Sequence, residues 1–340
     1  MPGMTALVCT KPGALAIDQR PAPHRAADEV LLHIRRVGTC GTDYHIFEGL
    51  HPFIDYPRVM GHELSGVVAE APASSSLRKD QVVTVNPYLS CGTCIACRKG
   101  KPNCCMAISV LGVHRDGGMC EWLCLPERNL LPADGLSLDA AASVEFLAIG
   151  AHAIRRSGMG QGAQVLVVGA GPIGLGAAIF ARIAGANVTM MDRDPGRIAL
   201  ARSTIGIEDL ILAGADAPEQ VAAATAGEGF EYVIDATGNR TSMEKGFGFV
   251  AHGGSYVLVS VVKDSITFSD AEFHKREMTL LGSRNATDAD FNRVIAAIKA
   301  GQVPIEKLVT HRTTLAGALD DLPRWAHEKS GLVKALIDIA

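Results

Sequence analysis

The stretch VLVVGAGPIG, at residues 165–174, decides the fold class of this chain. Its first four residues are typical of a strand buried on both faces, and the apolar run 173–183 predicts a helix directly after it. Between strand and helix, Gly169, Gly171 and Gly174 form the G-x-G-x-x-G pattern. The first glycine makes a tight turn, the second lets the backbone approach a pyrophosphate, and the third lets the helix pack on the strand. The stretch therefore predicts a dinucleotide site at a helix N-terminus, although a glycine-rich turn without a ligand stays open.

An acidic residue selects the nucleotide. Asp192 stands 18 residues after Gly174, at the end of the next predicted strand, 188–191. A carboxylate there accepts hydrogen bonds from the ribose hydroxyls and repels a 2′-phosphate, which favours NAD over NADP. Arg193 keeps NADP open, because a guanidinium beside the ribose can bind that phosphate. The expected cofactor-binding residues are Gly169, Gly171, Pro172, Ile173, Gly174, Asp192, Arg193 and Arg197.

The chain changes character along its length. Its first part has short β-rich runs at 29–37, 64–68 and 81–88, separated by glycine and proline turns. From about residue 162 strands alternate with helices, which predicts parallel βαβ units; the later strands are expected at 232–234, 255–261 and 278–282. The tail returns to helix and to a closing strand at 333–339. We therefore expect a β-rich unit, an inserted α/β unit, and an end that returns to the first unit.

Four of the nine cysteines follow the pattern Cys91-x2-Cys94-x2-Cys97-x7-Cys105. Four thiolates with no open position are typical of a structural zinc site. The alternatives are a redox-active C-x-x-C pair, a zinc ribbon for nucleic acid, and Cys104 in place of Cys105 as fourth ligand. Few basic residues surround the cluster, which argues against nucleic acid. Cys120 and Cys124, which share one face of the predicted strand 119–125, are expected in a packed core.

Composition narrows the function classes further. The 340 residues correspond to about two domains, with 48% hydrophobic and 20% charged residues. The net charge of −4, without a polybasic run, argues against nucleic-acid and anionic-membrane partners. The apolar stretch 165–181 contains four glycines and Pro172 and is too short to predict a membrane span. Residues 1–10 lack a secretory signal pattern, so a cytoplasmic location is expected.

Two further motifs resemble those of a known protein family. Residues 38–45, GTCGTDYH, and residues 61–63, GHE, resemble those of zinc-dependent medium-chain dehydrogenases. The four-cysteine pattern and the glycine motif follow in the same order, so the resemblance covers essentially the whole chain. It implies a GroES-like catalytic domain at 1–148 and 287–340 and a Rossmann NAD-binding domain at 149–286. This agrees with the α/β class predicted from the strand and helix pattern.

The resemblance also implies two zinc ions per chain, one catalytic and one structural. The catalytic zinc would be held by Cys40, His62, Glu63 and, directly or through water, Glu145. Asp43 is expected to hold His62 by its far ring nitrogen. Zinc with one open position acts as a Lewis acid on a substrate alcohol, so that hydride passes to NAD. Thr42 and His45 are expected to carry the released proton away.

Several segments resemble bacterial sugar-acid dehydrogenases of the L-galactonate 5-dehydrogenase kind. These segments are 111–118, 235–239, 273–275, 282–285 and 310–312. The resemblance implies a sugar acid or polyol substrate, with His114 as a further substrate contact. Arg284 directly follows the last predicted strand of the α/β unit, where its guanidinium could bind the carboxylate of a sugar acid. Binding of a cofactor phosphate or of an interface carboxylate by Arg284 stays open. Sorbitol-type polyol and threonine dehydrogenases remain alternatives. A zinc-free quinone reductase and a nucleotide-sensing relative are less favoured, because the zinc motifs are present.

The last strands of the α/β unit, at 255–261 and 278–282, leave a sheet edge that a monomer would expose. Pairing of two such edges across a two-fold axis would continue the sheet between subunits. We therefore expect a homodimer or homotetramer.

Overall fold

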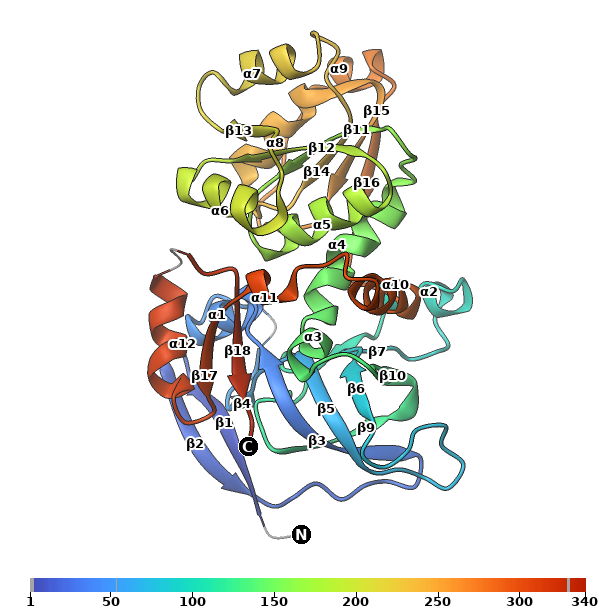
Figure 1. Ribbon diagram of the computed structural model, residues 1–340, viewed down its shortest axis with the longest axis vertical. Coiled ribbons are helices and arrows are strands. Elements are labelled where there is room, and N and C mark those ends of the chain that lie inside the picture. The colour runs from blue at the N-terminus through green and yellow to red at the C-terminus, as the bar shows by residue number, and fades with distance from the viewer. Residues whose placement is uncertain (1–2, 53, 329–330) are drawn as a thin grey trace. The chain divides into compact units, whose positions relative to one another are not determined.

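The computed structural model describes residues 3–52, 54–328 and 331–340. Its contacts divide the chain into two compact units. Unit 1 contains Met1–Glu145, Thr287–Gly301 and Ile305–Ala340, and unit 2 contains Phe146–Ala286 and Gln302–Pro304. Unit 1 is built on antiparallel and mixed sheets and unit 2 on a parallel sheet flanked by helices (Figure 1). The predicted α/β fold class is confirmed.

The larger sheet of unit 1 contains both early strands and the C-terminal strands. Its order is β10 (Leu130–Pro132), β6 (Val82–Val85), β5 (Glu63–Glu70), β3 (Glu29–Gly38), β18 (Lys334–Asp338) and β17 (Val309–Thr314), with β9 (Trp122–Pro126) also paired to β3. A second sheet has the order β2 (Ala14–Arg20), β1 (Met4–Lys11) and β4 (Arg58–Val59), and β7 (Tyr88–Leu89) pairs β8 (Ser109–Val110). The helices are α1 (Gly41–Phe47), α2 (Ile95–Arg98), α3 (Leu138–Ala142), α10 (Asp288–Lys299), α11 (Ile305–Leu308) and α12 (Ala318–His327).

Strand register in this sheet positions the site. Gly38, the last residue of β3, lies opposite Glu63 at the start of β5. On its other side Gly38 lies opposite Leu336, in the middle of β18. Alternate residues of β3, Val30, Leu32 and Ile34, are fully buried, each stabilising the sheet by about 1.5–3 kcal/mol. One end of a rigid sheet therefore carries segments that lie far apart in the sequence.

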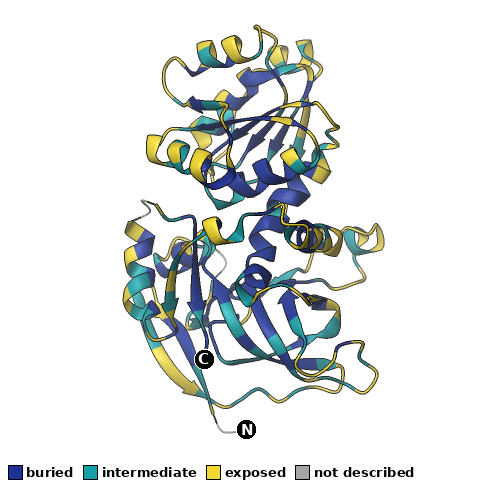
Figure 2. Ribbon diagram, in the orientation of Figure 1, coloured by how far each residue is buried: buried dark blue, intermediate teal, exposed yellow. Residues whose placement is uncertain are grey.

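The sheet of unit 2 is parallel throughout its described residues. Its order is β13 (Leu210–Leu212), β12 (Asn187–Asp192), β11 (Gln164–Val168), β14 (Phe230–Asp235), β15 (Val250–Leu258) and β16 (Thr279–Gly282). Its helices are α4 (Val144–Ser157, beginning in unit 1), α5 (Pro172–Ile183), α6 (Pro195–Ile205), α7 (Ala217–Ala224), α8 (Arg240–Gly246) and α9 (Asp270–Lys275). The central strands and α5 are largely buried (Figure 2). The predicted strand 255–261 ends instead at Leu258, and Val261 is 91% exposed.

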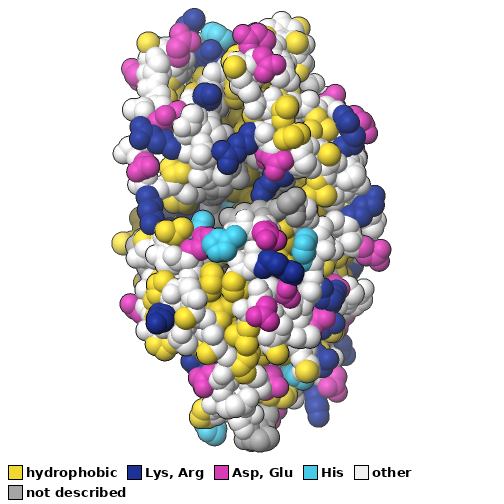
Figure 3. Space-filling view, turned by 90° about the vertical axis from the view of Figure 1, so that its left-hand side faces the viewer, with side chains coloured by type: hydrophobic (Ala, Val, Ile, Leu, Met, Phe, Trp, Pro, Cys, Tyr) yellow, Lys and Arg dark blue, Asp and Glu magenta, His cyan; other side chains and the backbone are white. Residues whose placement is uncertain are grey.

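The surface carries charges of both signs. Figure 3 shows basic and acidic side chains interspersed on the face in view. Among the described residues, no helix combines the length and apolar character that crossing a bilayer requires.

The glycine turn gives a first prediction, on stability. A Cβ at Gly174 would lie 1.7 Å from the carbonyl oxygen of Gly169, so Gly174→Ala must force the turn and α5 apart. We expect a loss of roughly 1–3 kcal/mol in the free energy of unfolding. Gly176→Ala, in the same helix, is the matched control, because its Cβ would come no closer than 3.6 Å to another atom. The urea midpoints of both variants measure the difference; equal midpoints would contradict the turn geometry.

Candidate functional site

Three side chains of unit 1 form a cluster suited to a metal ion. Ligand atoms of Cys40, His62 and Glu63 all lie within 4.8 Å of one another. Cys40 is the N-cap of α1, just after β3 ends, and Glu63 opens β5 opposite Gly38. The three residues come together because the end of β3 lies beside the start of β5.

Asp43 fixes both segments of this cluster through the backbone. Its carboxylate accepts the N–H of Cys40 at 2.9 Å and the N–H of Gly61 at 3.1 Å. The hydrogen bond expected from Asp43 to the far nitrogen of His62 is not found among the described residues, where Nδ1 of His62 has no partner. The reason is local: Asp43 occupies the third position of α1, from which its carboxylate reaches back to the N-cap amide.

The chemistry of the cluster fits zinc. A thiolate, an imidazole and a carboxylate are the three kinds of protein ligand that zinc binds. Desolvation lowers the pKa of His62, but the hydrogen bond and charge of Cys40 outweigh it and raise that pKa well above the usual value. The three residues would therefore hold the ion.

Lys334, which the sequence analysis missed, completes the surroundings of Glu63. Its ammonium donates to both carboxylate oxygens of Glu63, each at 2.7 Å. Desolvation opposes the charge on Lys334, but the Glu63 carboxylate outweighs it and raises the pKa of the ammonium. No local signal in the sequence predicts this pair, because the two residues are 271 positions apart.

Glu145 lies in the first turn of α4 and is 3% exposed. Its carboxylate accepts a hydrogen bond from the hydroxyl of Tyr88, a residue that sequence reasoning also missed. Burial and the charge of Glu145 raise the pKa of Tyr88, so the phenol keeps its proton and donates. Among the described residues the metal-suited cluster contains Cys40, His62 and Glu63 only. Glu145 is thus held by Tyr88 beside the cluster rather than in it.

The two residues expected to carry the proton lie on α1. The Cys40 thiol donates to the Thr42 hydroxyl at a sulfur–oxygen distance of 3.8 Å, so Thr42 is adjacent to the cluster. His45 is exposed and, three residues further along the helix, shares a face with Thr42. The helix therefore places a hydroxyl near the cluster and an imidazole near solvent.

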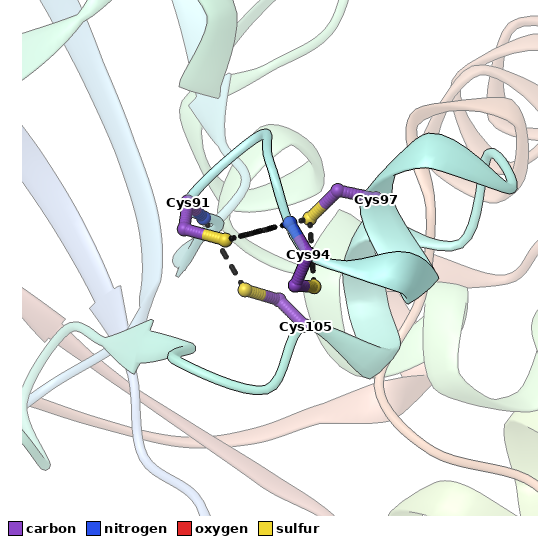
Figure 4. Close-up of side chains that lie close together, drawn as sticks. All are labelled: Cys91, Cys94, Cys97 and Cys105. Carbon is purple, nitrogen blue, oxygen red and sulfur yellow. Dashed lines mark hydrogen bonds between the residues drawn. The ribbon is translucent and has the colours of Figure 1, made fainter.

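The four-cysteine cluster forms in unit 1 as well. Ligand atoms of Cys91, Cys94, Cys97 and Cys105 lie within 4.8 Å of one another, and their sulfurs point toward a common centre (Figure 4). Backbone amides stabilise thiolates here: the N–H of Cys94 reaches the Cys91 sulfur at 3.4 Å. Hydrogen bonds led by the backbone of Thr93 lower the pKa of Cys91 to about 6. This geometry suits one tetrahedral ion, and Cys104 is not in the cluster.

The glycine motif has the geometry expected of a phosphate-binding turn. Gly169 has φ of 101°, a conformation that favours glycine, and Gly171 caps α5 with Pro172 in its first turn. The Asp192 carboxylate accepts the N–H of Ala170 at 2.7 Å, which places it beside the turn. A guanidinium nitrogen of Arg197 lies 3.2 Å from where a Cβ on Gly171 would be. Arg193 is exposed at the end of β12.

The two expected substrate residues are both exposed. Arg284 follows β16 in unit 2. His114 lies in the loop after β8, and its Nδ1 accepts the N–H of Val110 at 3.1 Å. The structure brings neither of them into the three-residue cluster.

Comparisons with known proteins define the class. Residues 26–135 match the family described as "Alcohol dehydrogenase GroES-like domain", and residues 172–300 match "Zinc-binding dehydrogenase". L-galactonate-5-dehydrogenase of Escherichia coli K12 is 42% identical over 338 residues, with 99% of each chain covered. Sorbitol dehydrogenase of Halalkalibacterium halodurans is 31% identical over 323 residues, covering 92% of this chain and 93% of that protein. A solved alcohol dehydrogenase (rspB) of E. coli CFT073, complexed with NADH, has a TM-score of 0.92 at 28% identity, covering 99% of this chain and 100% of that one.

The chain therefore belongs to the zinc-type alcohol dehydrogenases with a GroES-like domain. Its class is that of an alcohol or polyol oxidoreductase, as the sequence motifs predicted. Zinc and NAD as cofactors are consistent with the matched family and with the NADH-bound relative.

Proposed function

We propose that this protein is a zinc- and NAD-dependent dehydrogenase that oxidises a secondary alcohol of a sugar acid similar to L-galactonate. The observation that carries the proposal is the set formed by the half-buried Cys40 and the buried His62 and Glu63, because three protein ligands are typical of catalytic zinc sites. Zinc bound there supplies a Lewis acid for a substrate hydroxyl, and NAD supplies the hydride acceptor. Unit 1 would be the catalytic domain and unit 2 the NAD-binding domain.

Other residues of the chain would transfer the proton, bind NAD and hold the structural zinc. Thr42, adjacent to Cys40, would accept the substrate's hydroxyl proton while passing its own proton to the ribose of the bound cofactor. The exposed His45 would then pass a proton from the ribose to solvent. Asp192 would accept hydrogen bonds from the ribose hydroxyls of NAD. Arg197, which lies beside the glycine turn, would also contact the cofactor. Cys91, Cys94, Cys97 and Cys105 would hold the structural zinc.

The substrate assignment is supported by the 42% identical L-galactonate-5-dehydrogenase. A sugar acid differs from a neutral polyol by its carboxylate, and a guanidinium can bind a carboxylate through two parallel hydrogen bonds. We assign this contact to the exposed Arg284, with His114 as a second polar contact. A sorbitol-type polyol dehydrogenase is the second candidate, favoured by the 31% identical relative.

Replacing Arg284 separates the two candidates. We expect Arg284→Ala to lower kcat/KM for L-galactonate by about ten- to a hundredfold, since a charged hydrogen bond contributes roughly 1.5–3 kcal/mol. The kcat/KM for sorbitol and the NAD dissociation constant should stay nearly unchanged, and Arg284→Lys should recover only part of the loss. If Arg284→Ala lowers kcat/KM equally for both substrates, or if the wild type has the higher kcat/KM with sorbitol, the polyol assignment replaces the sugar-acid one.

We further propose that the chain forms a homodimer or homotetramer. β16 is the edge strand of the unit 2 sheet, and Leu280 on it is 36% exposed. An unpaired edge of this kind favours pairing with a second copy. Sedimentation velocity measures the assembly, and a monomer at micromolar concentration would contradict it.

A further inference from the structure

Lys334 bridges the two segments that carry the proposed zinc ligands. Besides both oxygens of Glu63 at 2.7 Å, its ammonium donates to the carbonyl oxygen of Thr39 at 2.9 Å. Thr39 directly precedes Cys40, and Glu63 directly follows His62. One side chain from β18 therefore contacts the residue that precedes the ligand Cys40 and also the ligand Glu63 itself.

The charges around this ammonium are predominantly negative. The carboxylates of Glu63 and Glu145, which are 0% and 3% exposed, both favour the charged form of this ammonium. Lys334 is 2% exposed, and no other lysine or arginine among the described residues is fully buried. An uncompensated buried carboxylate is costly, and the ammonium, which donates to both of its oxygens, offsets part of that cost at Glu63.

We propose that Lys334 is a positioning residue that takes the place of the metal when the catalytic site holds none, bridging the Cys40 and Glu63 segments and compensating the Glu63 carboxylate. The inference rests on the proposed catalytic zinc. A bound zinc would itself bridge Cys40 and Glu63 and supply positive charge. Lys334 therefore stabilises the zinc-free protein more than the zinc-loaded one.

This difference determines how a variant binds zinc. Lys334→Met removes the charge and keeps the side-chain length, so it should destabilise the zinc-free protein strongly and the loaded protein less. By thermodynamic linkage, zinc must then bind the variant more tightly than the wild type. We expect its dissociation constant at the Cys40 site to fall by about tenfold or more. Lys334→Arg keeps the charge and is the matched control. Its stability and its zinc dissociation constant should stay near those of the wild type.

The test uses full-length protein with the catalytic site stripped by a mild chelator and the four-cysteine zinc retained. Thermal midpoints of the zinc-free and zinc-loaded forms, and competition with a chromophoric chelator, are measured for wild type and both variants. We expect a larger fall of the midpoint in zinc-free than in zinc-loaded Lys334→Met, and tighter zinc binding. Equal falls with an unchanged dissociation constant, or weaker binding, would overturn the inference and leave the proposed function standing.

Two further outcomes are informative. If Lys334→Met does not fold even with zinc, the double variant Lys334→Met with Glu63→Gln removes both charges, and the stability of its zinc-free form should recover. No recovery would overturn the charge-compensating role. A wild type that binds zinc only in the four-cysteine cluster would instead overturn the proposed function, and this inference with it.

Discussion

Cys40→Ser is expected to lower turnover by about a thousandfold or more while the protein stays folded. The substitution removes the thiolate ligand of the proposed catalytic zinc, whose Lewis-acid action lowers the reaction barrier by several kcal/mol. Folding should survive, because Cys40 is only partly buried and stands at the N-cap of α1, where serine is a preferred residue. Initial rates of NAD reduction, together with zinc content and circular dichroism, measure the effect.

Cys124→Ser is the control for this substitution. Cys124 is half-buried on β9 and belongs to neither cysteine-containing cluster, so its variant should keep normal turnover and both zinc ions. Full activity of Cys40→Ser would contradict the assignment of Cys40 as a catalytic zinc ligand. Unfolding of the variant without loss of zinc would contradict it as well.

Cys94→Ser is expected to cost stability rather than chemistry. In a four-thiolate site the binding energy of zinc is folding energy, about 10–16 kcal/mol in small zinc-dependent peptides. Loss of one thiolate should therefore release one of two zinc ions per chain and lower the thermal midpoint markedly. Metal analysis and thermal unfolding give the two readouts.

Cys104→Ser tests whether the effect is specific to the cluster. Cys104 is exposed and directly precedes Cys105, yet it lies outside the four-sulfur set. Its variant should keep both ions and the wild-type midpoint. If Cys94→Ser folds normally and only turnover falls, the roles of the two zinc sites are reversed.

The sequence predicts those parts of the molecule whose signals are local. The glycine motif, the four-cysteine pattern and the Cys40 and His62-Glu63 segments each lie within a few residues of a recognisable strand or turn. β13 (Leu210–Leu212) was missed because three residues are too few to show periodicity. β17 (Val309–Thr314) was missed because it is largely polar, with alternate residues exposed.

The partners of the site residues could not be predicted in this way. Lys334 of β18 contacts Glu63 of β5 across 271 positions of sequence, and Tyr88 of β7 contacts Glu145 of α4 across 57 positions. No local pattern specifies either contact. The contact of Asp43 was also mispredicted, since its place in the first turn of α1 directs its carboxylate to backbone amides. Tertiary structure, rather than residue type, decides these contacts.

The most direct test of the account is the rate of NADH formation by the purified, zinc-loaded protein with L-galactonate, compared with sorbitol and L-threonine. The account predicts that kcat/KM with NAD is highest for L-galactonate, by about tenfold or more, and that a chelator which strips the Cys40 site abolishes it. No NADH formation from any sugar acid or polyol, by protein that contains both zinc ions, would contradict the account.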